Sequence, residues 1–172
     1  MEADSDFGLK ETGERVNIQQ IEACDDAFYY EVYASTRAEE ISAWGWPELQ
    51  SQHFLHMQFQ FQQRSYEMQY PNLARYIVMV DEERAGRLYL AREEQRWVLV
   101  DLSLLPAYRG LGVGTQLLKN IQDEAALAGR EVELQVRREN PARRLYERTG
   151  FTYTGEDELS YRMCWRSSLE RG

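Results

Sequence analysis

Three glycines that alternate along one short segment are the first residues whose type and spacing indicate chemistry. Residues 104–115 run from an apolar stretch through Gly110, Gly112 and Gly114 into a predicted helix. Glycine has no Cβ atom, so neighbouring backbone N–H groups can turn toward one point. The N-terminus of the helix adds unpaired N–H donors and a partial positive charge. The segment therefore predicts a phosphate cradle, and a tight strand-to-helix turn without a ligand is the simpler alternative.

Two common phosphate loops fit this segment poorly. A Walker loop ends in Gly-Lys followed by Ser or Thr, whereas Gly114 precedes Thr115 and Gln116. A dinucleotide fingerprint needs a third glycine five positions after the first, and Thr115 stands there when Gly110 is the first. The next predicted strand also lacks a closing acidic residue, because it ends on Val136 and Arg137.

Apolar periodicity defines the elements that hold this loop in place. Strands are expected at 15–21, 75–80, 87–91, 96–105, 131–136, 151–154 and 159–165. Helices are expected after Asp26, over 47–68, over 113–128, and as a short segment opened by Asn140-Pro141 and closed by Gly150. Residues 81–86 read as a turn between two hairpin strands. Phe54, Met57 and Phe61 form one apolar stripe on the second helix.

The order of these elements is β-α-α-β-β-β-α-β-α-β-β, which predicts a three-layer α/β or α+β domain. Residues 1–14 lack periodicity and are expected to be a flexible acidic tail, and 15–172 to be a single domain.

Two motifs at a fixed separation carry a family resemblance. Arg109-x-x-Gly112-x-Gly114, between a strand and a helix, resembles the coenzyme A loop of the GNAT acetyltransferase superfamily. Residues 134–136 and 140–151 resemble its second signature, a strand followed by Asn, a helix, Leu-Tyr and Gly-Phe. These motifs cover 102–151, and the element order matches over about 15–166. The resemblance implies a GNAT-like mixed central sheet of six to seven strands with about four helices.

The resemblance also implies the reaction and the cofactor. An acetyl group would pass from acetyl-CoA directly to a primary amine of a small molecule or peptide, without an acyl-enzyme and without a metal. The pyrophosphate would be held by Arg109, Gly110, Leu111, Gly112, Val113, Gly114 and Thr115. The pantetheine amides would pair with Leu102, Ser103 and Leu104. Asn140 either contacts the cofactor or caps the short helix, and the two roles are compatible.

Tyr146 is the candidate general acid for the departing thiolate. A phenol with a pKa near 10 is protonated at neutral pH and can donate its proton, and the family position implies that this hydroxyl faces the sulfur. Packing beside Leu145 as a core aromatic is the alternative.

The proton acceptor is less clearly marked. Some family members carry a Glu where this chain has Gln135, which argues against acetylation of the ribosomal-protein type. Asp101 is the alternative, because it is the only charge within 97–105 and is expected to share a strand face with Trp97, Leu99 and Ser103. A carboxylate there is costly unless it is hydrogen-bonded or hydrated. It would act as the base, brace the neighbouring backbone, or lie exposed.

Glu40, Trp44 and Trp46 lie where the family places a mobile substrate loop, with Glu39 beside them. Two tryptophans around a glycine can attract an amine by cation–π contact, and packing between helices is their alternative role. Residues 1–40 contain eleven acidic and three basic side chains, which favours a cationic acceptor if they border the site.

Composition excludes several other classes. A formal net charge of −9 argues against nucleic-acid binding, and no apolar run is long enough to span a membrane. Cys24 and Cys164 are far apart in sequence and form no metal or disulfide motif, so we expect no metal and a cytoplasmic location. A non-catalytic acyl-CoA sensor is the alternative function. O-acyl transfer, a longer acyl donor and homodimer formation are left open.

Overall fold

The computed structural model describes residues 15–21 and 25–168. The predicted acidic tail over 1–14 lies outside the described residues. The elements are β1 (Val16–Gln20), α1 (Asp26–Ala43), α2 (Glu48–Gln69), β2 (Leu73–Val80), β3 (Glu83–Arg92), β4 (Arg96–Leu104), the short 3₁₀ helix η2 (Pro106–Tyr108), α3 (Val113–Leu127), β5 (Glu131–Arg137), α4 (Ala142–Arg148), β6 (Thr152–Glu156) and β7 (Ser160–Trp165). This is the predicted order of strands and α-helices.

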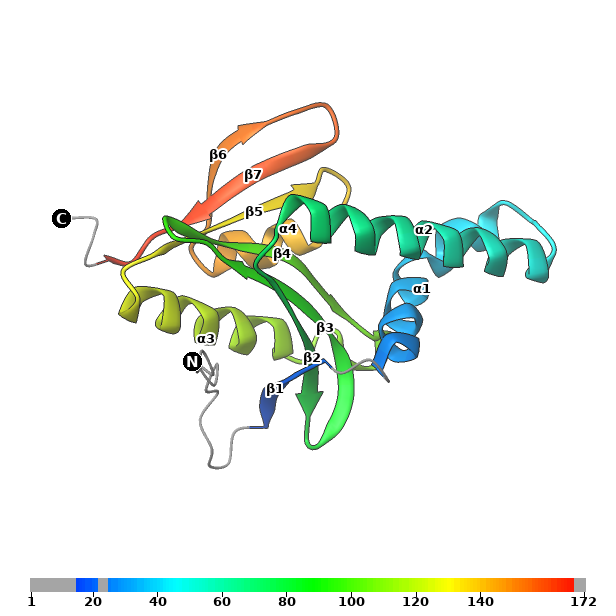
Figure 1. Cartoon of the computed structure of the whole chain (residues 1–172), viewed down its shortest axis with the longest axis horizontal. Coiled ribbons are helices and arrows are strands. Elements are labelled where there is room, and N and C mark those ends of the chain that lie inside the picture. Colours follow the sequence, from blue (N-terminus) through cyan, green and yellow to red (C-terminus); the bar gives the residue numbers. More distant parts are fainter. Residues whose placement is uncertain (1–14, 22–24, 169–172) are drawn as a thin grey trace.

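One mixed sheet forms the centre of the molecule (Figure 1). Its seven strands follow the order β1-β2-β3-β4-β5-β7-β6. β4 and β5 are parallel to each other, and the other neighbouring pairs are antiparallel. A parallel pair needs a crossover connection, and here that crossover contains the glycine loop and α3.

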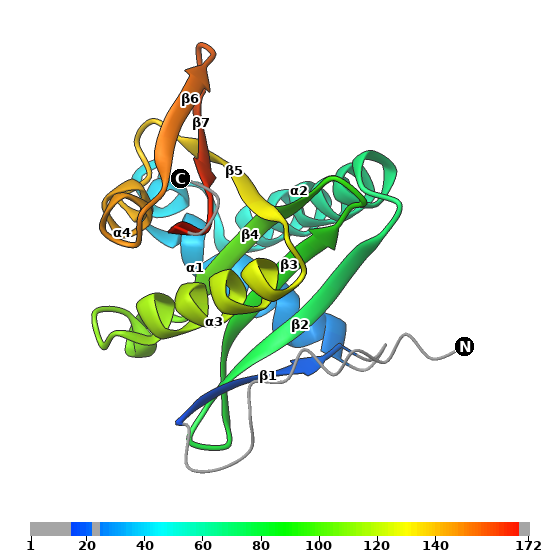
Figure 2. The same ribbon diagram turned by 90° about the vertical axis from the view of Figure 1, so that its left-hand side faces the viewer.

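Helices cover both faces of the sheet, which gives three layers (Figures 1 and 2). α3 and α4 pack on one face over a core that contains Leu117, Ile121 and Leu134. α1 and α2 pack on the other face, over a second core around Tyr29, Val32 and Ile77. Within the described residues, no helix combines the length and apolar character needed to cross a bilayer.

A β-bulge in β4 reverses the face on which the candidate base lies. Leu99 pairs with Leu90 and Asp101 pairs with Tyr89, so Val100 is the extra residue. Trp97 and Leu99 belong to the core under α3. Asp101 bonds Arg87, which also bonds α2, on the opposite face. The prediction that Asp101 shares a face with Trp97 and Leu99 was wrong, because one inserted residue changes the alternation of side chains.

The parallel pairing of β4 with β5 covers only the first part of each strand. The paired residues run from Arg96 opposite Glu131 to Leu99 opposite Leu134. Beyond the bulge, β4 continues to Leu104 beside β3 but has no further described pair with β5. One edge of the second half of β4 is therefore open, with no described strand paired to it.

One local prediction was wrong in detail, and most of the predicted apolar stripe on α2 lies on the exposed side of that helix. The predicted turn over 81–86 is shorter, because Asp81 and Glu82 adopt positive φ angles of 49° and 68° and β3 begins at the next residue. On α2 the buried residues are Leu55 and Phe59, whereas Met57 and Phe61 of the predicted apolar stripe are exposed.

Candidate active site

The glycine loop between β4 and α3 has the backbone geometry of a ligand cradle. Gly110 and Gly112 have φ angles of 74° and 81°, which residues with a Cβ atom seldom adopt. A Cβ atom built on Gly112 would have nothing within 4 Å. The space in front of the start of α3 is therefore open. Residues 109–112 are exposed to solvent.

The first turn of α3 supplies the donors of this cradle. The Gln116 N–H donates to the Gly112 carbonyl at 3.0 Å and closes the first turn, so the N–H groups before it have no partner within the helix. Gly112, the capping residue, offers no side chain to bond them, and the first turn has no acidic residue. This helix end therefore favours an anion.

The open edge of β4 adds backbone groups beside the cradle. The Leu105 N–H donates to the Ala85 carbonyl at 2.8 Å, and antiparallel alternation then turns the backbone groups of Leu102 and Leu104 away from β3. Those of Ser103 point toward β3. The prediction that the Ser103 backbone pairs with the pantetheine therefore does not fit.

The Leu104 carbonyl already has a partner in the free protein. It accepts a hydrogen bond from Nε of Arg109 at 2.9 Å. A carbonyl oxygen has two lone pairs, so a ligand amide can bond this carbonyl beside Arg109 or displace the exposed Arg109 side chain. A displaced guanidinium would then be free to meet a phosphate.

Tyr146 is held at a fixed place by the packing of α4 on α3. A Cβ atom on Gly114 would lie 2.8 Å from Leu145 Cδ2, so glycine lets the two helices approach closely without displacing the Leu145 side chain. The Gln122 amide of α3 donates to the Thr149 carbonyl at 2.8 Å. The Tyr146 ring packs edge-to-face on Phe151, with 5.7 Å between centroids. The contacts of α4 with α3 and the Phe151 ring therefore hold the Tyr146 side chain in place.

The Tyr146 hydroxyl is held in its neutral form. The side chain is buried, and burial raises the pKa of this phenol well above 10, with a further contribution from the Asp101 charge. Among the described residues, this hydroxyl has no hydrogen-bond partner. Its proton is therefore retained at neutral pH and is not committed to another protein group.

Asp101 is part of a buried ion pair that the sequence did not predict. Its Oδ2 accepts a hydrogen bond from Nη2 of Arg87 at 2.6 Å, and its Oδ1 accepts one from Ser103 Oγ at 2.8 Å. The Arg87 side chain is 2% exposed and that of Asp101 is 15% exposed. Of the alternatives considered for Asp101, a fully exposed position is excluded.

Arg87 connects the sheet to α2 and is surrounded by aromatic rings. Its Nη2 also donates to Gln62 Oε1 at 2.8 Å. Its guanidinium carbon lies 5.5 Å from the centre of the Tyr33 ring and 5.2 Å from that of Tyr89. Nε and Nη1 have no hydrogen-bond partner among the described residues. Asp101 is therefore the counter-charge that makes this buried cation tolerable.

Asn140 has the capping role that was one of its two predicted roles. Its Oδ1 accepts a hydrogen bond from the Ala142 N–H at 2.9 Å, at the start of α4. The residue is exposed. Its contact with a cofactor stays a prediction.

The predicted substrate loop forms an aromatic cluster between α1 and α2. The rings of Trp44 and Trp46 lie 4.9 Å apart and pack on Phe54 at 5.6 and 5.5 Å. Glu40 accepts a hydrogen bond from Nε of Arg37 at 2.7 Å, and this bond lowers the pKa of the Glu40 carboxyl. Packing between the helices is thus observed for both tryptophans, whereas amine binding stays a prediction.

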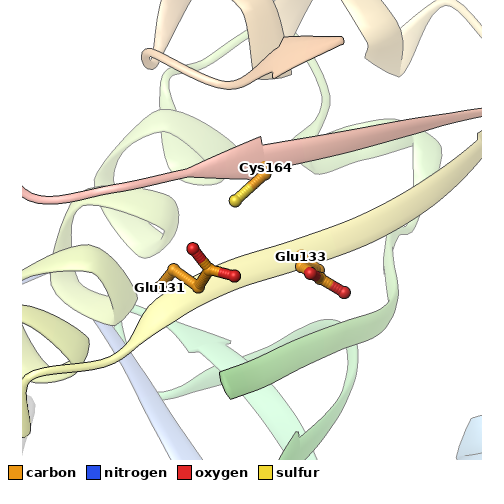
Figure 3. A group of neighbouring side chains, drawn as sticks. All are labelled: Glu131, Glu133 and Cys164. Atoms are coloured by element: carbon orange, nitrogen blue, oxygen red, sulfur yellow. The ribbon is translucent and has the colours of Figure 1, made fainter. Parts of the chain in front are cut away.

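Glu131, Glu133 and Cys164 form a group on β5 and β7 whose ligand atoms lie within 4.8 Å of one another (Figure 3). Each carboxylate is already paired, Glu131 with Arg166 at 2.7 Å and Glu133 with Arg96 at 2.8 Å. Burial and then the Glu131 charge raise the pKa of the Cys164 thiol to about 11. A thiol must lose its proton to bind a metal, so these residues are better described as ion pairs beside a neutral thiol.

Buried and partly buried tyrosines predict a loss of stability at alkaline pH. Burial raises the pKa of Tyr29, Tyr66, Tyr89 and Tyr146 above 10. Their contribution is complete below the unfolded pKa near 10 and is lost as pH rises toward the folded values, because the unfolded chain releases these protons first. We expect the free energy of unfolding to fall above pH ~10, by up to about 1.4 kcal/mol per tyrosine and pH unit. Urea unfolding at several pH values measures this free energy. Tyr66→Phe lacks one of the four phenols, so its free energy of unfolding should fall less steeply with pH. The same steepness as in the wild type would contradict the prediction.

Comparison with known proteins agrees with this geometry. The sequence profile described as the acetyltransferase (GNAT) family matches residues 33–151, and no curated protein matches the chain. PaiA N-acetyltransferase from Thermoplasma acidophilum, solved with coenzyme A, is 18% identical, with a TM-score of 0.66 over 88% of this chain and 99% of that one. PH1933 from Pyrococcus horikoshii OT3 is 18% identical, with a TM-score of 0.66 over 90% and 99% of the two chains.

The ribosomal-protein-S18-alanine N-acetyltransferase from Escherichia coli is 19% identical, with a TM-score of 0.59 over 87% of this chain and 92% of that one. At these identities the structures show a shared fold, and the profile covers more than half of the sequence. The chain belongs to the GNAT acetyltransferase family.

Proposed function

We propose that the protein transfers an acetyl group from acetyl-CoA to a primary amine, in the cytoplasm. The observation that most directly supports this proposal is the uncapped N-terminus of α3 beside the open edge of β4. The loop that joins them has the sequence pattern Arg109-x-x-Gly112-x-Gly114. One site binds an anion and the adjacent one pairs with an extended amide chain. Coenzyme A contains both chemical features, and the solved PaiA relative contains coenzyme A.

The residues divide the binding task between them. The N–H groups at the start of α3, with Arg109, hold the diphosphate. The backbone groups of Leu102 and Leu104 on the open edge of β4 align the pantetheine, and Arg109 shares or releases the Leu104 carbonyl. When bound, acetyl-CoA supplies the activated acetyl group. Tyr146 then holds a proton on Oη, ready for the thiolate that leaves when the amine takes the acetyl group. The raised pKa of this phenol keeps the proton in place throughout the neutral range.

We propose that the main role of Asp101 is to balance the positive charge of the buried Arg87. If Asp101 accepted the amine proton, its ion pair with Arg87 would be lost and a guanidinium would stay buried without a counter-charge. An Asp101 that stays ionised keeps this ion pair intact while the amine proton passes to water. Proton acceptance by Asp101 itself is the competing proposal.

The acceptor is proposed to be a cationic small molecule or a peptide amine. The net charge of −9 favours the approach of a cation, and Glu40, Trp44 and Trp46 offer a carboxylate and two rings between α1 and α2. Gln135, which is exposed on β5, offers no carboxylate at the position where some relatives have one. This argues against an acceptor of the ribosomal-protein type.

The direct test is thiol release from acetyl-CoA in the presence of a panel of amines. The panel should contain polyamines, amino acids and peptides with free amino termini. We expect one class to accelerate release well above the rate without protein. Binding of acetyl-CoA without turnover on any amine would instead support the acyl-CoA sensor, and absence of binding would refute both.

Replacing Gly112 with valine tests the cradle. We expect the affinity for coenzyme A to fall about tenfold or more, because the new side chain occupies the open space before α3 and phosphate hydrogen bonds contribute about 1.5–3 kcal/mol. Titration calorimetry measures the change. Gly129→Val is the matched control, since Gly129 also has a positive φ and an open Cβ position but follows the opposite end of α3. Equal affinities in the two folded variants would refute the cradle.

A further inference from the structure

α2 has apolar side chains on two sides, and only one side is covered. Its buried residues are Leu55 and Phe59, which is little burial for a helix of 22 residues. Met57, Phe61 and Met68 are 48%, 55% and 83% exposed. At 3.6 residues per turn these three lie within about 40° of one another around the helix, on the side away from Leu55 and Phe59. We call the side of α2 that carries them its outer face.

The outer face has a hollow on its first half and projecting side chains on its second half. The hollow measures about 590 Å³ and is lined by Trp46, Gln50, His53, Phe54, His56, Met57 and Gln60. Phe61 and Met68 follow it on the same side of the helix. In Figure 1 this end of the molecule, where α1 meets α2, reaches beyond the sheet.

We propose that the outer face of α2 is a homodimer interface, in which two α2 helices pack antiparallel about a two-fold axis near Met57. A two-fold interface must be complementary to itself. With the axis at Met57, Phe61 of one copy lies opposite His53 of the second copy, and Met68 lies opposite Trp46. The projecting half of each helix thus enters the hollow half of the other.

The charge distribution favours a second copy at this face. Two chains of net charge −9 repel each other, so they can meet only where their surfaces carry few charges. Over 48–69 the charged residues are Glu48, Arg64 and Glu67, and most other polar residues are glutamines. Arg64 lies over the Phe61 ring at 5.9 Å and adds a positive charge to the face.

The length of the face argues for a helix rather than a small acceptor as its occupant. The exposed apolar residues extend from Leu49 to Met68, which corresponds to about 28 Å at 1.5 Å per residue. A second α2 has this length and the same neutral surface. The inference is independent of cofactor binding, because none of its residues holds the cofactor, and Trp46 is the one residue that it shares with the proposed acceptor site.

Sedimentation equilibrium of the full chain tests the proposal. We expect twice the monomer mass of 20.3 kDa for the wild type, and the monomer mass for Phe61→Glu, because two carboxylates would be buried in the interface. Leu127→Glu is the matched control, since Leu127 is 91% exposed on α3 and its variant should stay dimeric. A monomeric wild type at all concentrations would overturn the proposal and leave the hollow to a different partner.

Cross-linking tests the position of the axis without disturbing the fold. Under mild oxidation, Met57→Cys should form a disulfide between two copies, because this residue meets itself across the axis. Gln69→Cys is exposed at the far end of the same helix and should not. Both variants contain the same native cysteines, so any background cross-linking is equal. A dimer that survives Phe61→Glu and gives no Met57→Cys cross-link would show that the copies meet elsewhere.

Discussion

Replacing Tyr146 by phenylalanine is expected to lower kcat by about 10²–10⁴ while leaving the fold and coenzyme A affinity nearly unchanged. The ring keeps its packing on Phe151 and its place beside α3. Its hydroxyl has no hydrogen-bond partner among the described residues, so no protein hydrogen bond is lost. The effect therefore falls on the step in which the thiolate develops, and kcat should fall more than KM rises.

Three measurements on Tyr146→Phe make this result decisive. Steady-state kinetics on the true acceptor gives kcat and KM, calorimetry gives the affinity for coenzyme A, and thermal melting reports the fold. Tyr153→Phe serves as the control, because Tyr153 is exposed on β6 and its hydroxyl donates to the exposed Glu147 at 3.1 Å. Wild-type kcat in Tyr146→Phe would show that the hydroxyl is dispensable. A large fall in melting temperature would show that it is structural.

The pH profile adds a further check on the state of Tyr146. Because its pKa is raised above 10, the hydroxyl stays protonated throughout the neutral and mildly alkaline range. Titration of this hydroxyl should therefore not lower the wild-type rate between pH ~7 and pH ~9. Any decline in that range should also be present in Tyr146→Phe. Such a decline would mean that the cofactor brings the phenol into its titration range.

The helices and strands were predictable from the sequence where the buried residues recur at one regular spacing. α3 was expected over 113–128 and is observed as Val113–Leu127, because its apolar residues recur on one side of the helix. Those residues, Val113, Leu117, Ile121 and Ala125, are all buried. α2 was harder to interpret, since apolar residues lie on two of its sides and periodicity does not say which side meets the sheet.

The glycine loop was predictable for a different reason, because its geometry depends on residues near in sequence. Positive φ angles at Gly110 and Gly112 and an uncapped helix end follow from local composition. The polar centre around Asp101 depends instead on pairing between strands. The bulge at Val100 inserts one residue into a continuous apolar run, and nothing in that run marks the insertion.

Arg87 was missed although the sequence contains a signal for it. It is the only charged residue in the predicted strand 87–91, and Asp101 is the only charged residue within 97–105 of the next strand. Two isolated opposite charges in adjacent strands suggest an ion pair. The pairing needs the register that places Arg87 opposite Ser103, which the structure supplies.

Asp101→Asn is expected to give the largest loss of stability among single substitutions at this site. Asparagine keeps the shape but leaves Arg87 buried without a counter-charge, and removal of one member of a buried pair costs about 3–5 kcal/mol. For a chain of this length that loss corresponds to a fall in melting temperature of roughly 6–20 °C. Thermal melting at neutral pH measures it.

The double variant Arg87→Met with Asp101→Leu separates the two proposals for Asp101. It removes both charges, so the buried guanidinium no longer needs compensation and the melting temperature should recover most of the loss. If Asp101 acts through Arg87, kcat/KM should recover with the fold. If Asp101 accepts the amine proton, the double variant should stay as inactive as Asp101→Asn. The loss of kcat/KM relative to the wild type should then be largest at low pH, where fewer acceptor amines are already neutral. We expect recovery, because Arg87 and Ser103 already occupy one lone pair on each Asp101 oxygen and proton uptake would break the buried pair.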